Sequence, residues 1–261
     1  MMTHVRLHVH EFGPGAGRTI VALHGVTGAA TVFRRLAHRL PGFRLVAPDL
    51  RGHGGSRADP PWDLSVHLRD VRETLDALGI ARAPFIGFSF GGRLAMELVA
   101  ADRSRVEKLI LLDPAIQVAE EAVIARTNEL LHEESWADPA EAIESRLKLG
   151  AAPYAPREHW ELWSEGLVET SDGRLRLPFS RPAAITIYSE LATPPPRFES
   201  LRLPTLLIVG SESALVTQKQ RDRYKYELAD FLEIKSVRAK HNVIADAADD
   251  VAAAIGAFLA R

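Results

Sequence analysis

Short apolar runs alternate with segments of helical periodicity along the first 115 residues. Four of these runs predict buried strands: residues 18–25, 43–56, 83–89 and 106–115. The run at 43–56 continues into a glycine-rich loop. Between them, apolar residues recur every three or four positions, as on one face of an amphipathic helix. The clearest such face is formed by Leu64, Leu68, Val71, Leu75 and Leu78, and a second helix is predicted at 91–101. The pattern predicts an α/β fold with a mostly parallel, doubly wound sheet and helices on both faces.

The alternation of strands and helices stops after residue 115 and resumes after residue 200. Residues 116–200 show no strand pattern, and helices are predicted near 117–133, 138–149, 157–168 and 181–192. The proline-rich stretch "TPPPRFESLRLP" closes this segment, and the chain continues with strands at 205–210 and 231–237 and helices at 217–229 and 246–260. We therefore expect a core domain made of residues 1–115 and 201–261, interrupted by a helical cap insertion at 116–200 that covers the strand ends.

Composition and charge exclude several classes of partner. The chain has 261 residues, of which 46% are hydrophobic and 25% charged, with a net charge of −2 and no block of like charges. This balance argues against a nucleic acid or an anionic membrane surface as partner. No apolar run approaches the roughly 18 residues of a membrane span. The chain has no cysteine, which excludes disulfides, thiolate metal sites and cysteine nucleophiles, and a cytoplasmic location is expected.

One serine has the sequence context of a catalytic nucleophile. The stretch Gly87-Phe88-Ser89-Phe90-Gly91 fits the pattern Gly-x-Ser-x-Gly and lies between a predicted strand and a predicted helix. Such a junction holds the serine in a strained turn, and the flanking glycines let strand and helix approach each other closely. The hydroxyl of Ser89 is then exposed at the positive end of the helix, where a nucleophile is favoured.

From this motif onward the chain resembles the α/β-hydrolase superfamily over nearly its whole length. Three further motifs carry the resemblance: "LHGVTG" at 23–28, "DLRGHGGS" at 49–56 and "KHNVIADAADDVAAAIGAFL" at 240–259. The resemblance implies that His241 is the general base for Ser89, since a serine hydroxyl needs a positioned imidazole to become nucleophilic. It also implies an oxyanion hole made by the backbone N–H groups of Val26 and Phe90, with no metal ion and no cofactor.

The carboxylate that normally orients the histidine base is missing from its usual place. By the resemblance it lies three residues beyond Gly210, where this chain has Ser213. Glu212 is an acid, but it lies one position out of register and has a longer side chain. Some members of the superfamily supply the acid from the end of the preceding core strand, which here is Asp113. Asp113, Glu212 and the absence of any functional acid all remain open at this point.

Arg93, four residues after Ser89, is a second departure from the pattern. A cation in the first turn of a helix opposes the local field of the helix dipole, so it needs a partner or a purpose. One interpretation is a salt bridge to a carboxylate of the cap or a loop; the other is a bidentate clamp on a substrate carboxylate. "SFGGR", "GHGGS" and the pair His241-Asn242 also resemble SHCHC synthase, a lyase that uses the same triad.

The other histidines are expected to have no part in catalysis. His4, His8 and His10 alternate along an N-terminal strand, but no clustered carboxylate completes a metal site, so a solvated strand face is predicted. His24 and His53 are expected to be structural. Four others fall in predicted helices and are interpreted as surface residues: His38, His67, His132 and His159.

These observations favour a serine hydrolase that cleaves small to medium carboxylic esters through an acyl-enzyme on Ser89. An apolar acyl pocket is expected from the cap residues Trp136, Trp160, Trp163 and Phe179, although tryptophans at such spacings more often form the core of a cap. Phe88 and Phe90 beside the serine also favour an apolar substrate, and Phe88 is expected to contact it. Two alternatives remain: a lyase or C–C bond hydrolase whose carboxylated substrate is held by Arg93, and a non-catalytic binding protein that kept the fold.

Overall fold

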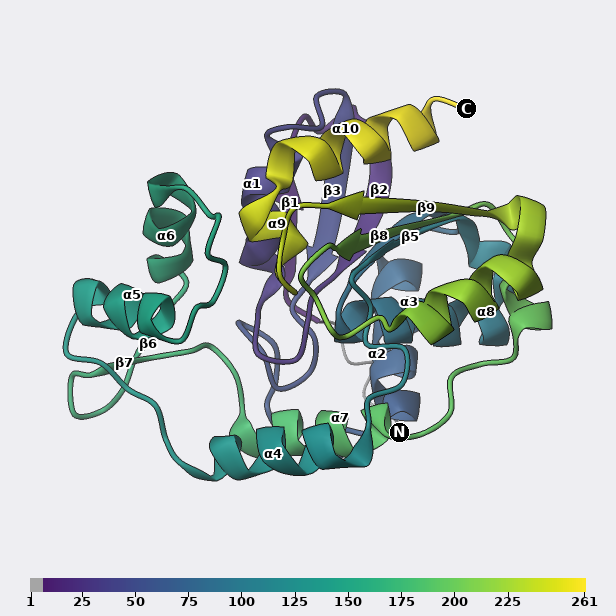
Figure 1. Ribbon diagram of the computed structural model, residues 1–261. Helices are drawn as coiled ribbons and strands as arrows, with labels where there is room; N and C mark the ends of the chain where they lie inside the picture. Colours follow the sequence, from purple (N-terminus) through teal and green to yellow (C-terminus); the bar gives the residue numbers. More distant parts are fainter. Residues whose placement is uncertain (1–6) are drawn as a thin grey trace, which may run out of the picture.

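A seven-stranded sheet forms the centre of the computed structural model, which describes residues 7–261 (Figure 1). The strand order is β1-β3-β2-β4-β5-β8-β9, and all neighbours are parallel except the edge pair β1 and β3. The strands are β1 (Val9–Phe12), β2 (Arg18–Leu23), β3 (Phe43–Pro48), β4 (Ala83–Phe88), β5 (Val106–Leu112), β8 (Thr205–Gly210) and β9 (Leu232–Val237). The predicted mostly parallel sheet is confirmed.

Helices cover both faces of the sheet, because alternate side chains of each buried strand point to opposite sides. In β2, Val21 and Leu23 pack on one side while Ile20 and Ala22 pack on the other. The first side is covered by α2 (Leu64–Ala77), α3 (Phe90–Ala101) and α8 (Gln218–Leu228). The second is covered by α1 (Arg34–Ala37), α9 (Val243–Asp246) and α10 (Ala248–Leu259). The doubly wound arrangement is therefore confirmed.

The inserted segment between β5 and β8 is mainly helical, as predicted. Its helices are α4 (Glu120–Leu131), α5 (Pro139–Lys148), α6 (Arg157–Ser164) and α7 (Arg181–Leu191). Figure 1 shows α4 beside α7, with α5 and α6 in a separate lobe. The expectation of no strand here was wrong, because β6 (Val168–Glu169) pairs with β7 (Leu175–Arg176). Strands of two residues are too short to leave a periodic pattern. The boundaries of the insertion at 116 and 200 stay a prediction.

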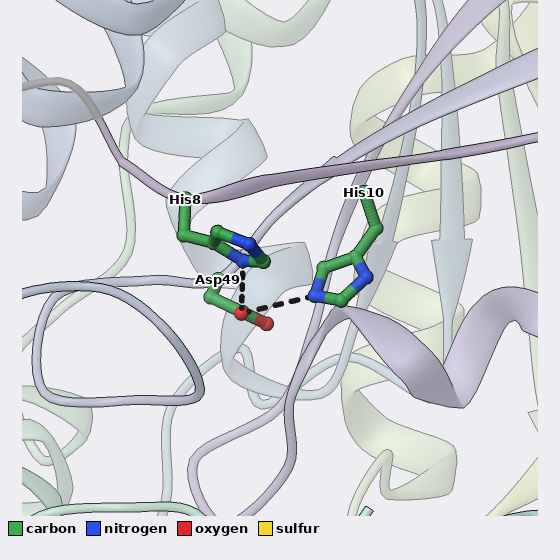
Figure 2. Close-up of side chains that lie close together, drawn as sticks. All are labelled: His8, His10 and Asp49. Carbon is green, nitrogen blue, oxygen red and sulfur yellow. Dashed lines mark hydrogen bonds and ion pairs between the residues drawn. The ribbon is translucent and has the colours of Figure 1, made fainter.

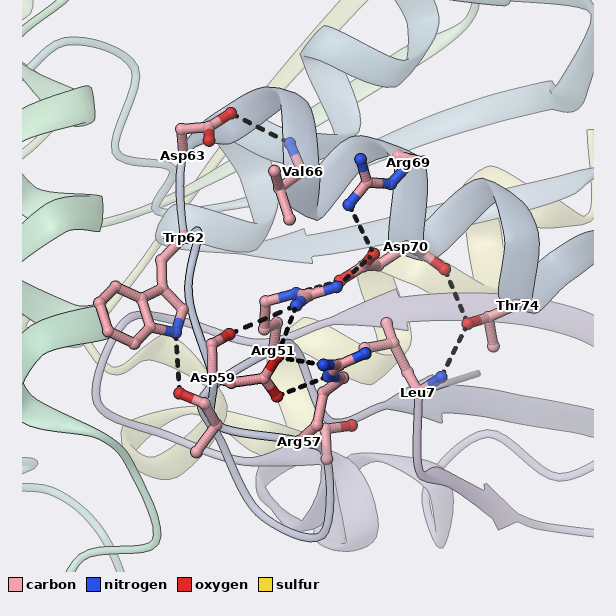
Figure 3. Close-up of polar contacts among 12 residues, drawn as sticks. Leu7, Arg51, Arg57, Asp59, Trp62, Asp63, Val66, Arg69, Asp70 and Thr74 are labelled. Atoms are coloured by element: carbon pink, nitrogen blue, oxygen red, sulfur yellow. Dashed lines mark hydrogen bonds and ion pairs between the residues drawn. The ribbon is translucent and has the colours of Figure 1, made fainter. Parts of the chain in front are cut away.

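A buried ion pair fixes the loop between β3 and α2 (Figure 3). Arg51 Nε and Nη2 donate to the two carboxylate oxygens of Asp70, at 2.6 and 2.9 Å, and both side chains are almost completely buried. Thr74 Oγ1 donates to the backbone oxygen of Asp70 and accepts from the N–H of Leu7. The bidentate geometry holds the loop rigidly, and this loop carries His53.

Two short elements next to the sheet had no periodic signature in the sequence. The 3-10 turn η1 (Ala30–Phe33) leads into α1, and α9 begins directly after the loop of His241. Each has only one turn of helix, which is too short for apolar residues to recur on one face. Among residues 7–261, no helix is long and apolar enough to cross a membrane.

Candidate active site

Ser89 occupies the sharp turn between β4 and α3 with φ 54° and ψ −117°, a backbone conformation that non-glycine residues rarely adopt. The turn is this tight because the flanking residues are glycines: a Cβ on Gly87 would collide with the backbone of Gly91, and one on Gly91 with the carbonyl of Leu23. Strain of this kind is retained where the surrounding structure enforces it, and it is concentrated at functional sites.

Ser89, His241 and Asp113 form one chain of hydrogen bonds. Ser89 Oγ lies 3.0 Å from His241 Nε2, and His241 Nδ1 lies 2.7 Å from Asp113 Oδ2. The tautomer that satisfies both contacts has its proton on Nδ1, so Nε2 is free to accept the serine proton. The three residues come from the β4–α3 turn, the loop after β9 and the end of β5. The structure thus brings together the two residues expected from the sequence and one of the two candidate acids.

The carboxylate of Asp113 is completely buried, and its position is enforced by several partners. Its Oδ1 accepts from the backbone N–H of Gly210 at 3.2 Å, and its Oδ2 accepts from the hydroxyl of Ser213 at 2.6 Å as well as from His241. Asp113 also has a positive φ of 40°. Ser213 stands where the resemblance places the usual acid, and here its hydroxyl donates to Asp113 at the end of the neighbouring strand. The sequence feature that pointed to this contact is the small polar residue, Ser213, at the position where an acid was expected.

Glu212, the other candidate acid, is directed toward the cap. Its carboxylate accepts from the hydroxyl of Tyr154 at 2.5 Å, while its backbone N–H donates to the oxygen of Ala239. Among the carboxylates of residues 7–261, the one that is hydrogen-bonded to His241 belongs to Asp113. The alternative assignment of Glu212 as the partner of His241 has no contact in its favour.

The backbone N–H groups of Val26 and Phe90, which the resemblance assigns to an oxyanion hole, are both without a protein acceptor within the described chain. Phe90 is the first residue of α3. His53 Nε2 is hydrogen-bonded to the carbonyl of Val26, and this contact fixes the loop that follows β2. The side chain of Phe90 is fully buried against His67 and does not face a substrate.

Several histidines other than His241 are buried and neutral. Burial lowers the pKa of His24 to about 3; its Nε2 accepts from the N–H of Leu50, and its Nδ1 lies 2.8 Å from the carbonyl of Gly25. Burial also lowers the pKa of His67 to about 3 and that of His159 to about 4. The prediction that His67 and His159 are surface residues was therefore wrong, because both helices turn these positions toward the interior.

Burial of His67 has a consequence for stability at low pH. The imidazole is fully buried, and neither of its nitrogens has a hydrogen-bond partner. Because its pKa is about 3 in the folded protein and 6.5 for a free imidazole, the unfolded chain binds the proton more readily. The part of the free energy of unfolding that comes from keeping His67 neutral is fully present above pH 6.5, and it is lost as the pH falls from 6.5 toward 3.

The aromatic residues predicted to line a substrate pocket have other neighbours. The ring of Phe88 stacks on the imidazole of His241, with centroids 5.1 Å apart, and so helps to orient this ring. Trp163 contacts both Trp136 and Trp160 edge to face, and Trp136 also packs under the guanidinium of Arg146. Trp136 and Trp160 are buried, so they form the core of the cap lobe rather than a pocket wall.

Arg93 is buried, and each of its donors has a protein partner. Its Nε donates to Glu97 at 2.8 Å, and Nη1 donates to the carbonyls of Ile116 and Thr193. Nη2 donates to Thr193 Oγ1 and to the carbonyl of Pro194. The side chain therefore joins α3 to both ends of the insertion. No donor is left for a substrate carboxylate, which argues against the clamp hypothesis. The role is structural, but the carboxylate partner is Glu97 of α3 rather than one of the cap or a loop.

The N-terminal histidines require a further correction. Asp49 lies beside His8 and His10, so a carboxylate does complete a cluster of three metal-ligand side chains (Figure 2). The sequence did not reveal it because Asp49 follows a different strand. His4 lies outside the described residues.

The fold, the strained serine turn and the triad geometry define an α/β hydrolase. The family model for the alpha/beta hydrolase fold matches residues 18–230, and the chain belongs to this family, as its sequence motifs indicated. Among named relatives, Lipase LipV of Mycobacterium tuberculosis (strain ATCC 25618 / H37Rv) is 35% identical over 188 residues, which cover 72% of each protein.

Two other similarities agree with this assignment. A protein of Bacillus subtilis (strain 168), provisionally named 2-succinyl-6-hydroxy-2,4-cyclohexadiene-1-carboxylate synthase, is 35% identical over 112 residues, or 41% of this chain and 40% of that protein. The crystal structure of E-2-(acetamidomethylene)succinate hydrolase superposes with a TM-score of 0.85 at 24% identity, covering 98% of this chain and 95% of the other. The second similarity concerns the fold alone.

Proposed function

We propose that this protein is a serine carboxylesterase that cleaves small to medium esters through an acyl-enzyme on Ser89. The observation that carries the proposal is the continuous hydrogen-bonded chain from Ser89 through His241 to Asp113, with contacts of 3.0 and 2.7 Å. The similarity to a named lipase over most of the chain supports the same class of substrate.

In the first half of the reaction, Ser89 Oγ attacks the acyl carbon of the ester while its proton moves to His241 Nε2. The buried carboxylate of Asp113 stabilises the imidazolium that forms. The backbone N–H groups of Val26 and Phe90 donate to the oxyanion of the tetrahedral intermediate, where a single donor contributes about 3 kcal/mol. Collapse of the intermediate breaks the bond to the alcohol, which takes the proton from His241.

In the second half, water replaces the alcohol. His241 removes a proton from the water as it attacks the acyl carbon, and then returns this proton to Ser89 Oγ as the carboxylic acid leaves. The stacking of Phe88 on the imidazole and the support of Asp113 by Ser213 keep the base in one orientation through both halves. Reaction through this cycle requires no metal ion or cofactor.

The size of the substrate is proposed from the surroundings of the nucleophile. Ser89 is only 7% exposed, and cap residues contact both the loop that carries His241 and the helix α9 that follows it. Tyr154 donates its N–H to Asp246, and Lys240 Nζ donates to the carbonyl of Gly150. A site closed in this way favours short acyl chains over bulky ones.

The proposal is tested with p-nitrophenyl esters of increasing acyl length, using the wild type, Ser89→Ala and the matched control Ser65→Ala on the exposed side of α2. We expect hydrolysis by the wild type and the control, highest for short to medium chains, and none above background for Ser89→Ala. An inactive wild type, or activity that survives Ser89→Ala, would contradict the proposal.

A further inference from the structure

The pairing of the first strand places two histidines around one buried aspartate. In the antiparallel register of β1 and β3, Val9 lies opposite Pro48, so His8 lies opposite Asp49, whose N–H donates to the carbonyl of His8 at 2.8 Å. His10 is two residues further and therefore on the same face as His8. The three side chains meet at the β1–β3 edge of the sheet, and β2 separates β3 from β4, the strand that leads into the Ser89 turn.

The contacts within this cluster converge on a single oxygen atom. His8 Nδ1 lies 3.0 Å and His10 Nε2 lies 3.2 Å from Asp49 Oδ2, as Figure 2 shows. The three potential ligand atoms all lie within 4.8 Å of one another. The carboxylate is 1% exposed, whereas His8 is 50% and His10 26% exposed. The cluster therefore has a buried carboxylate on one side and is open to solvent on the side of the two histidines.

The buried carboxylate of Asp49 is held in place by backbone N–H groups. Its Oδ1 accepts from the N–H of Ala30 at 2.8 Å, and its Oδ2 accepts from the N–H of Gly55 at 2.9 Å. Burial alone would raise the pKa of Asp49, but the hydrogen bonds from Gly55 and Ala30 and the nearby histidines outweigh burial and lower this pKa. A Cβ on Gly55 would lie 2.7 Å from the ring of His8, so the glycine provides the space for that ring.

We propose that His8, His10 and Asp49 bind one divalent transition-metal ion, with zinc as the occupant. Two imidazoles and one carboxylate are typical zinc ligands and suit Mg²⁺ or Ca²⁺ poorly. At metal–ligand bonds near 2.1 Å, tetrahedral coordination separates neighbouring ligand atoms by roughly 3.4 Å. The two contacts to Asp49 Oδ2 need to open by only a few tenths of an ångström to reach this separation. The two imidazole nitrogens, which lie within 4.8 Å of each other, have to move closer together, and the exposure of His8 leaves its ring free to turn.

Binding of the ion replaces the hydrogen bonds that now connect the three side chains. Each imidazole stays neutral by carrying its proton on the ring nitrogen that does not face the metal, and water completes the coordination on the open side. The ion joins the edge strand β1 to the loop after β3. Because it binds the folded arrangement and not the unfolded chain, it raises the thermal stability of the protein.

The test is zinc titration of the untagged, chelator-treated full-length chain by calorimetry, together with thermal unfolding with and without zinc. The variants are His8→Gln, His10→Gln and, as a matched control, His38→Gln, which removes an exposed histidine beside α1. We expect one zinc per chain in the wild type and the control, and a rise in Tm with zinc. Each variant of the cluster is expected to weaken binding by at least about tenfold and to abolish the rise in Tm.

Two controls keep the outcome interpretable. Substitution of Co²⁺ reports coordination directly, because its visible absorption band depends on nitrogen and oxygen ligands and is expected in the wild type but not in His10→Gln. Esterase activity of the variants is expected to equal that of the wild type, which shows that they fold. The proposal is overturned by the absence of saturable zinc binding, or by binding that His8→Gln and His10→Gln leave unchanged.

Discussion

Asp113→Asn is the substitution that discriminates best between the candidate acids. Asparagine adopts positive φ more readily than most residues, so the backbone at φ 40° is preserved. If its amide nitrogen faces His241, it donates where Asp113 accepts at 2.7 Å, and it forces the proton of the imidazole onto Nε2. Ser89 then has no acceptor for its proton. Loss of this tautomer control in a triad lowers kcat by about 10⁴, which corresponds to about 5.5 kcal/mol.

The assay is kcat for p-nitrophenyl butyrate near neutral pH, with thermal unfolding as a check that the variant is folded. Glu212→Gln is the matched control, since Glu212 contacts Tyr154 and not His241. We expect Glu212→Gln to keep nearly the full rate. The reasoning is refuted if Asp113→Asn keeps its rate, or if the control loses as much as Asp113→Asn does.

A second substitution tests whether the role of the acid can be moved. The hydroxyl of Ser213 lies 2.6 Å from the same oxygen that contacts His241, so a carboxylate at position 213 reaches toward the imidazole. We expect Ser213→Asp, introduced into Asp113→Asn, to restore a measurable part of the lost rate. A double variant no faster than Asp113→Asn would show that residue 213 cannot take over this role.

Three further predictions concern buried charges and histidines. Arg93→Met removes the donors to both ends of the insertion and is expected to lower the free energy of unfolding by about 3 kcal/mol. Its KM is expected to change equally for neutral and carboxylated esters, and an increase confined to carboxylated esters would restore the clamp hypothesis. Asp70→Asn leaves Arg51 uncompensated and is expected to cost about 3 to 5 kcal/mol in urea unfolding, whereas an unchanged midpoint would contradict the buried pair. His67→Leu is expected to keep about 2 kcal/mol of stability that the wild type loses between pH 6.5 and about pH 5. Urea unfolding of both proteins at about pH 7.5 and pH 5 checks this, and parallel losses would rule out His67 as the source.

The core of the fold was predictable because its elements are long and strongly patterned. Strand β4 is apolar throughout and buried on both faces, and α2 repeats its apolar residues every three or four positions. The pair β6 and β7 was missed because two-residue strands leave no period in the sequence. Whether an element could be predicted from the sequence therefore depended on its length and not on its place in the fold.

The nucleophile and base were predictable from local motifs, but the remaining contacts of the site were not. The choice between Asp113 and Glu212 depends on how two strand ends align across the sheet, which no local pattern encodes. The same holds for Asp49, which meets His8 only through the register of β1 with β3. Arg93 was ambiguous for the same reason, since its partners other than Glu97 lie more than 20 and about 100 positions away.

The most direct test of the account is labelling with a fluorophosphonate, which reacts with activated serines, followed by mass mapping of the modified peptide. We predict one label per chain, located on Ser89, with labelling strongly reduced in His241→Gln and unchanged in Ser65→Ala. Absence of any label on a folded protein that is also inactive toward p-nitrophenyl esters, or a label on a different serine, would contradict the assignment of Ser89 as an activated nucleophile.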